Sequence, residues 1–135
     1  MSKIQSIHHL NFVVRELEPQ IDYFRRLLQT EPVIEELPLR QVKTARFNLS
    51  GVWIVLVQPL STEGEVAEIL STHGEGLFLL SLGVESLEQS MEMLSQKGIH
   101  AKPKGKRPGL DNWIVQDLDC PQGLGPVLQL CQLNF

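Results

Sequence analysis

The segment HLNFVVRELEPQIDYF, His9 to Phe24, recurs in its apolar pattern as LLSLGVESLEQSMEML, Leu79 to Leu94, at a shift of 70 positions. Apolar residues coincide where a strand and a helix would bury them: Leu10 with Leu80, Phe12 with Leu82, Val14 with Val84, Leu17 with Leu87, Ile21 with Met91 and Phe24 with Leu94. A shared pattern of this kind indicates two similar structural modules.

Each copy predicts a strand followed by a helix. Alternating apolar residues between Leu10 and Val14 indicate a strand with one buried face. Apolar residues with helical spacing follow from Leu17 to Leu28. In the second copy the helical spacing extends from Leu87 to Leu94, and Gly98 is a C-terminal stop.

Three short strands are expected after each helix. They are VIEEL, VKTARFNL and VWIVLVQ in the first half, and GIHAKP, NWIVQDL and PVLQLCQL in the second. We therefore predict an α+β fold in which two βαβββ modules form a curved, mostly antiparallel sheet with helices on its outer face. One domain is expected over residues 1–135, with module one at about 5–60, a linker helix at about 61–75 and module two at about 76–135.

The composition argues against several classes of function. A net charge of -4 and a pI near 5.5 provide no basic stripe for nucleic acid. The apolar stretches are too short to span a membrane, and the N-terminus lacks the apolar core of a signal peptide. With only two cysteines, the chain is expected to be cytoplasmic and to keep its thiols reduced.

Side-chain alternation divides the predicted strands between two sheet faces. If Leu10, Phe12 and Val14 pack beneath the helix, the residues between them point to the opposite face, where we expect ligand contacts. The same rule assigns to that face His9, Asn11, Val13, Trp53, Val55, Val57, Leu79, Ser81, Val127, Gln129 and Cys131, and also Arg46 and Asn48 if Phe47 and Leu49 are buried. The ligand-binding candidates are His9, Asn11, Arg46, Val55, Leu79 and Gln129, and no catalytic residue is identified.

The order of these segments resembles that of proteins in the vicinal oxygen chelate superfamily, which has the glyoxalase, bleomycin-resistance and dioxygenase fold. Within this superfamily, the sequence is most similar in look to the methylmalonyl-CoA epimerases. IHHLNFVV resembles the opening strand, LVQPLSTEGEVAEIL the passage from strand to helix, GEGLFLLSLGVESLEQSMEMLSQKGI the opening of the second module and PVLQLCQ the closing strand. The resemblance implies one divalent metal held by four residues, two from each module.

The positions that match those ligands are His9, Val55, Leu79 and Gln129. Valine and leucine have no donor atoms, whereas a catalytic zinc takes three protein ligands and a water. Gln58 would lie on the other side of its strand unless a bulge turned it back. We therefore expect no metal or other cofactor, with a divalent metal as the less favoured alternative.

Two basic features have alternative explanations. Arg46 would bind a ligand carboxylate or phosphate, or would be solvated near a sheet edge. The segment KPKGKRPG, residues 102–109, would contact a nucleotide or coenzyme A phosphate, but its prolines and glycines favour a solvated turn. His8, His73 and His100 have no companion at metal-ligand spacing and are assigned to the surface or to packing.

Three functions remain open. The favoured hypothesis is a small-molecule-binding protein like the bleomycin-resistance members, because Val55 and Leu79 make an apolar site centre. The alternative is a lyase or isomerase of the glyoxalase or methylmalonyl-CoA epimerase type, with Arg46 and Gln129 as partners of an oxyanion. In the third, the sheet face serves mainly in dimerisation. A homodimer that binds a small organic ligand is expected, without nucleic acid or membrane as a partner.

Overall fold

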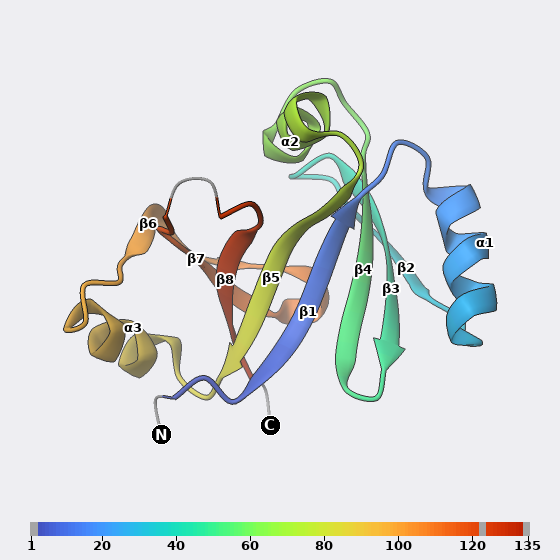
Figure 1. The fold of residues 1–135 in the computed structure, drawn as a ribbon. Coiled ribbons are helices and arrows are strands. Elements are labelled where there is room, and N and C mark those ends of the chain that lie inside the picture. The colour runs from blue at the N-terminus through green and yellow to red at the C-terminus, as the bar shows by residue number, and fades with distance from the viewer. Residues whose placement is uncertain (1–2, 122–123, 134–135) are drawn as a thin grey trace. The chain divides into compact units, whose positions relative to one another are not determined.

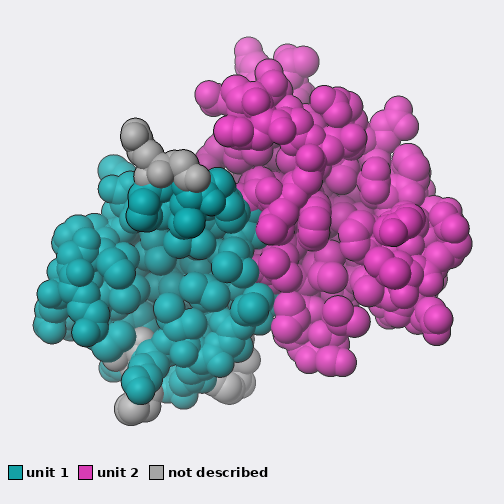
Figure 2. Space-filling model, in the orientation of Figure 1, with its two compact units in different colours: residues 1–8, 79–135 teal, residues 9–78 magenta. Residues whose placement is uncertain are grey.

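The structure is a computed structural model that describes residues 3–121 and 124–133. The chain forms two compact units, and we describe each by itself. Unit 1 comprises residues 1–8 and 79–135, and unit 2 comprises residues 9–78 (Figure 2). Across the described ranges, no helix combines the length and the apolar character that a membrane span needs.

Unit 2 contains the strand, helix and three strands of the first module (Figure 1). Its elements are β1 (Ser6–Val13, of which residues 6–8 belong to unit 1), α1 (Leu17–Leu28), β2 (Val33–Leu37), β3 (Val42–Leu49), β4 (Val52–Pro59) and the connecting helix α2 (Glu65–His73). The strand order is β2-β3-β4-β1. β3 is antiparallel to both of its neighbours, and β1 is parallel to β4.

Unit 1 repeats this arrangement. Its elements are β5 (Gly76–Val84, of which residues 76–78 belong to unit 2), α3 (Leu87–Ser95), β6 (Ala101–Pro108), the short 3-10 helix η1 (Leu110–Asn112), β7 (Ile114–Leu118) and β8 (Val127–Gln132). The strand order is β5-β8-β7-β6, with β5 parallel to β8 and the other pairings antiparallel. The predicted α+β fold of two βαβββ modules is confirmed.

One apolar core lies beneath the helix of each unit. In unit 2 the buried residues are Val14, Leu17, Ile21, Ala45, Phe47 and Leu56. In unit 1 they are Val84, Leu87, Leu118 and Leu130. Along the strands, core residues occupy alternate positions, such as Ala45 and Phe47 on β3 and the partly buried Leu82 with Val84 on β5, so the residues between them point to the face opposite the helix.

A glutamine satisfies the first turn of a helix in each unit. The Leu17 N–H donates to Oε1 of Gln58 at 2.7 Å, and the Leu87 N–H donates to Oε1 of Gln132 at 3.0 Å. The first N–H groups of a helix have no partner inside the helix, so these side chains act as caps from a neighbouring strand. The β3–β4 register is unbroken from the Val42–Pro59 pair to the Leu49–Val52 pair, so Gln58 lies on the helix side, as the alternation predicted.

Gln58→Ala should therefore lower the free energy of unfolding by about 1 kcal/mol, because a partly buried N–H loses its acceptor. Urea unfolding followed by circular dichroism measures the change. Gln89→Ala removes an exposed glutamine side chain from α3 and should change the stability by less than about 0.5 kcal/mol. Equal effects of the two substitutions would contradict the capping role of Gln58.

One local prediction was wrong, and one expected condition was met only in part. The segment at residues 102–109 is not a solvated turn, because β6 extends through Pro108. The condition set for Arg46 and Asn48, that Phe47 and Leu49 are buried, is met by Phe47 but not by Leu49, which is 44% exposed. Leu49 lies at the last position of β3, next to the turn at Ser50 and Gly51, where the α1 core no longer covers the strand.

Candidate functional site

Polar residues line up across the four strands of unit 1 on the face opposite α3. Gln129 of β8 is the cross-strand partner of Ser81 on β5 and of Asp117 on β7, and Arg107 reaches Asp117 from β6. We call Ser81, Gln129, Asp117 and Arg107 the polar row. The first three are buried, with exposed fractions of 0%, 3% and 1%. Such burial of polar groups is costly unless the groups have partners.

The Asp117 carboxylate is the centre of the polar row. Nη2 of Arg107 lies 3.1 Å from Oδ1 and 3.3 Å from Oδ2, Nζ of Lys104 lies 2.9 Å from Oδ2, and Nε2 of Gln129 donates to Oδ1 at 2.9 Å. Burial raises the pKa of Asp117, but the hydrogen bonds from Lys104 and Gln129 and the charges of Arg107 and Lys104 outweigh it, so the pKa lies below its usual value. The carboxylate is ionised at neutral pH. Two cations, Lys104 and Arg107, thus contact this one anion.

Three buried atoms of the polar row have no hydrogen-bond partner among the described residues. They are Oγ of Ser81, Oε1 of Gln129 and Nη1 of Arg107. Because an ionised carboxylate only accepts hydrogen bonds, the Gln129 amide must turn its NH₂ group toward Asp117 and its oxygen away. An unmet buried polar group costs about 1–3 kcal/mol, so atoms of this kind are candidates for contact with a ligand.

Unit 2 has a second polar group on the face opposite α1. Nη1 of Arg46 lies 2.6 Å from Oε1 of Glu35, and the Arg46 guanidinium lies 5.3 Å from the centre of the Trp53 ring. Arg46 is 6% exposed, so the alternative of a solvated arginine is wrong. Oδ1 of Asn11 is buried and has no partner within the described part of the chain.

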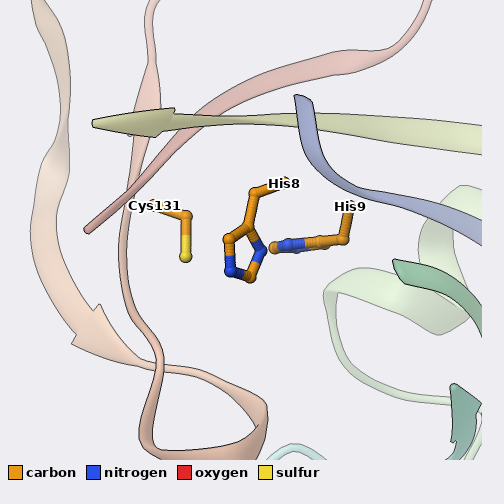
Figure 3. A group of neighbouring side chains, drawn as sticks. All are labelled: His8, His9 and Cys131. Carbon is orange, nitrogen blue, oxygen red and sulfur yellow. The ribbon is translucent and has the colours of Figure 1, made fainter. Parts of the chain in front are cut away.

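The side chains of His8 and Cys131, both in unit 1, approach each other (Figure 3). One ring nitrogen of His8 lies within 4.8 Å of the Cys131 sulfur, and the His8 ring packs edge-on against Trp113 with 4.6 Å between ring centres. Burial lowers the pKa of His8 and raises the pKa of Cys131 to about 12. His8 is therefore neutral and Cys131 a protonated thiol at neutral pH, so this thiol is a poor nucleophile. The sequence assigned His8 to the surface or to packing and did not bring it to Cys131.

The structure divides the predicted ligand-binding residues between the units. His9, Asn11, Arg46 and Val55 belong to unit 2, and Leu79 and Gln129 to unit 1. All except Asn11 are buried. Each lies at a strand position that alternates with the core beneath the helix of its own unit.

Sequence reasoning missed Asp117 as part of a site, and it weighed Lys104 and Arg107 only as phosphate contacts in a segment where a solvated turn was favoured. The Asp117 carboxylate lies 2.9 Å from Nε2 of Gln129, a neighbour that the sequence interpretation had not identified. The alternation in NWIVQDL contained the signal: Ile114 packs against the α3 core, and Val115 and Asp117 then fall on the other face.

Comparisons with known proteins agree with this architecture. The profile of the Glyoxalase/Bleomycin resistance protein/Dioxygenase superfamily matches residues 8–116, more than half of the chain. The chain belongs to this superfamily, as its resemblance to vicinal oxygen chelate proteins predicted.

Solved structures of the same fold include a hypothetical protein from Bacillus halodurans C-125, with a TM-score of 0.87, 23% identity and coverage of 96% of this chain and 94% of that chain. Methylmalonyl-CoA epimerase from Mycobacterium tuberculosis has a TM-score of 0.86 and 20% sequence identity, and the match covers 98% of this chain and 90% of that chain. A variant of Streptomyces coelicolor methylmalonyl-CoA epimerase in complex with 2-nitronate-propionyl-CoA has a TM-score of 0.85 and 18% sequence identity, and the match covers 98% of this chain and 100% of that chain. At these identities the likeness extends to the fold.

Proposed function

We propose that this protein binds a small organic molecule on the sheet face opposite its helices and does so without the divalent metal of its superfamily. The observation that carries the proposal is the chemistry of Val55 and Leu79, which stand at two of the four implied ligand positions. Both are buried, at 0% and 5% exposure, and neither has a donor atom. Apolar residues with a few placed polar groups are typical of sites for organic ligands.

The remaining donors do not fit the metal. In unit 2, Val55 has no donor atom at the position that would complement His9, and Gln58 is engaged with Leu17 on the helix side. In unit 1, the amide nitrogen of Gln129 is committed to Asp117, whose carboxylate is already neutralised by two cations. Divalent metals prefer negatively charged oxygen ligands, and the two cations beside this carboxylate repel them.

A lyase or isomerase of the epimerase type is the second candidate. It is favoured by the Arg46–Glu35 pair, in which a carboxylate 35% exposed lies 2.6 Å from a cation. Proton abstraction next to a carbonyl uses a base of this kind together with a positive group that stabilises the oxyanion. Under either function, the homodimer and the cytoplasmic location stay predictions.

Metal content is the first test of the proposal. Elemental analysis of the purified protein should find far less than one equivalent of any divalent metal. Manganese, cobalt, nickel or zinc should move the melting temperature by less than about 1 °C, because a ligand stabilises only the state that it binds.

The control for metal binding is His9→Ala, which should match the unsubstituted protein in both measurements. Stoichiometric metal that is lost in His9→Ala would overturn the proposal and restore a metalloenzyme. Cys131→Ser tests separately whether any zinc that is found depends on the thiol near His8.

A further inference from the structure

We infer that the polar row of unit 1 binds a small monocarboxylate that carries a hydroxyl or amide N–H group, with Arg107 as the residue that binds the carboxylate. The inference rests on the proposed function and names the class of its ligand. Four facts support it: the two cations at one carboxylate, the unmet hydrogen-bonding atoms, their spacing across the strands and the rigid placement of Arg107.

The charge of the site favours a single negative charge. Lys104 and Arg107 both lie within 3.1 Å of the carboxylate of Asp117, so two cations contact this anion. A monocarboxylate would add a second negative charge and balance the two cations. A phosphate monoester, with a charge of about -1.5 to -2 at neutral pH, would exceed this balance.

The unmet atoms define what the ligand must offer. Nη1 of Arg107 needs an acceptor, which a carboxylate oxygen supplies. Oε1 of Gln129 needs a donor, which a carboxylate lacks, so a second group with an O–H or N–H is required. The Ser81 hydroxyl can donate to or accept from that second group.

The strand spacing sets the distance between the two ligand groups. The Arg107 guanidinium lies beside Asp117 on β7, Gln129 is on the adjacent β8, and Ser81 is on β5, one strand further. Neighbouring strands are about 4.8 Å apart. The carboxylate and the donor of the ligand should therefore be separated by roughly 5 Å, the length of a short hydroxy acid.

Asp117 is a positioning residue in this arrangement. It accepts hydrogen bonds from Nη2 of Arg107 with both of its oxygens, which fixes the guanidinium and leaves Nη1 for the ligand. Lys104, with 32% of its side chain exposed, forms an ion pair with the same carboxylate. The Arg107 side chain is 23% exposed, although its Nη1 atom is buried.

Calorimetric titration of the full chain tests the inference, with 4-hydroxybutyrate as the probe. Butyrate lacks the hydroxyl, the methyl ester lacks the charge, and inorganic phosphate tests the selectivity. We expect 4-hydroxybutyrate to bind more tightly than butyrate, and the ester and phosphate not to bind. Arg107→Gln should weaken the binding of 4-hydroxybutyrate by about tenfold or more. Ser81→Ala should weaken it while leaving butyrate unchanged.

Lys106→Gln is the matched control, because it removes one positive charge from an exposed neighbouring position of β6 and should leave the affinity unchanged. Arg107→Lys keeps the positive charge but lacks the planar guanidinium group, so it should retain part of the affinity. This variant separates the loss of the charge from a folding defect in Arg107→Gln. Equal affinity of Arg107→Gln and the unsubstituted protein, or no heat from any acid, would overturn the carboxylate subsite. The proposed function itself fails only if stoichiometric metal is found.

Discussion

Asp117→Asn should lower the free energy of unfolding at pH 7 by roughly 3 kcal/mol. The substitution preserves the shape of the side chain but removes a negative charge that Lys104 and Arg107 both contact. Removing one partner of a buried ion pair is expensive because the other charges stay buried without compensation. Both cations keep some contact with water, at 32% and 23% exposure, so the effect should fall at the lower end of the range for buried pairs.

The pH dependence of stability provides an independent check on Asp117. Its pKa is lower in the folded protein than in the unfolded chain, so the unfolded chain takes up the proton first as the pH falls. The stabilisation is therefore fully present above the unfolded value, near 3.8, and is lost as the pH falls through the folded pKa. Asp117→Asn should lack this part of the acid-dependent loss.

Urea unfolding at pH 7 and at several values between pH 5 and 3 measures both effects. Asp119→Asn is the control, because Asp119 is an exposed aspartate two residues along the chain. A loss no larger than that of the control, or an unchanged acid profile, would mean that the charge of Asp117 does not stabilise unit 1.

The helices and most strands could be predicted because their signals are local. Helix α1 spans Leu17–Leu28, the range that its apolar period indicated, and β2 and β3 have the predicted bounds. The exception is β6, which was expected at residues 98–103 but begins at Ala101 and continues through Gly105 to Pro108. β6 is the last strand in the order of unit 1 and its register shifts between Ala101 and Lys106, conditions under which proline and glycine are tolerated.

The candidate site was predicted less completely, because its contacts depend on strand pairing. Alternation placed Gln129 on the correct face, yet its partner Asp117 lies 12 residues earlier on another strand. Only the β7–β8 register brings the two side chains together, and a shift of one residue would turn Asp117 to the other face. Gln58 is the opposite case, since alternation alone was enough to place it on the helix side.

Phe47→Ala should lower the free energy of unfolding by about 4 kcal/mol, because it leaves a cavity in the core of unit 2. Phe47 is fully buried, and its ring lies 6.1 Å from that of Phe24 on α1. The loss combines the transfer of an aromatic ring to water with the contacts that α1 can no longer make. Urea unfolding measures the change, and Phe47→Leu, which keeps most of the volume, should lose only about 1 kcal/mol.

Leu49→Ala is the control on the same strand and face as Phe47. Leu49 is 44% exposed, so its truncation should change the stability by less than about 0.5 kcal/mol. The contrast between the two positions tests where the α1 core ends along β3. If Leu49→Ala destabilised the protein as much as Phe47→Ala, Leu49 would have to be buried in solution. The surface that buries it would then be sought first on a second copy of the chain, the expected partner in a homodimer.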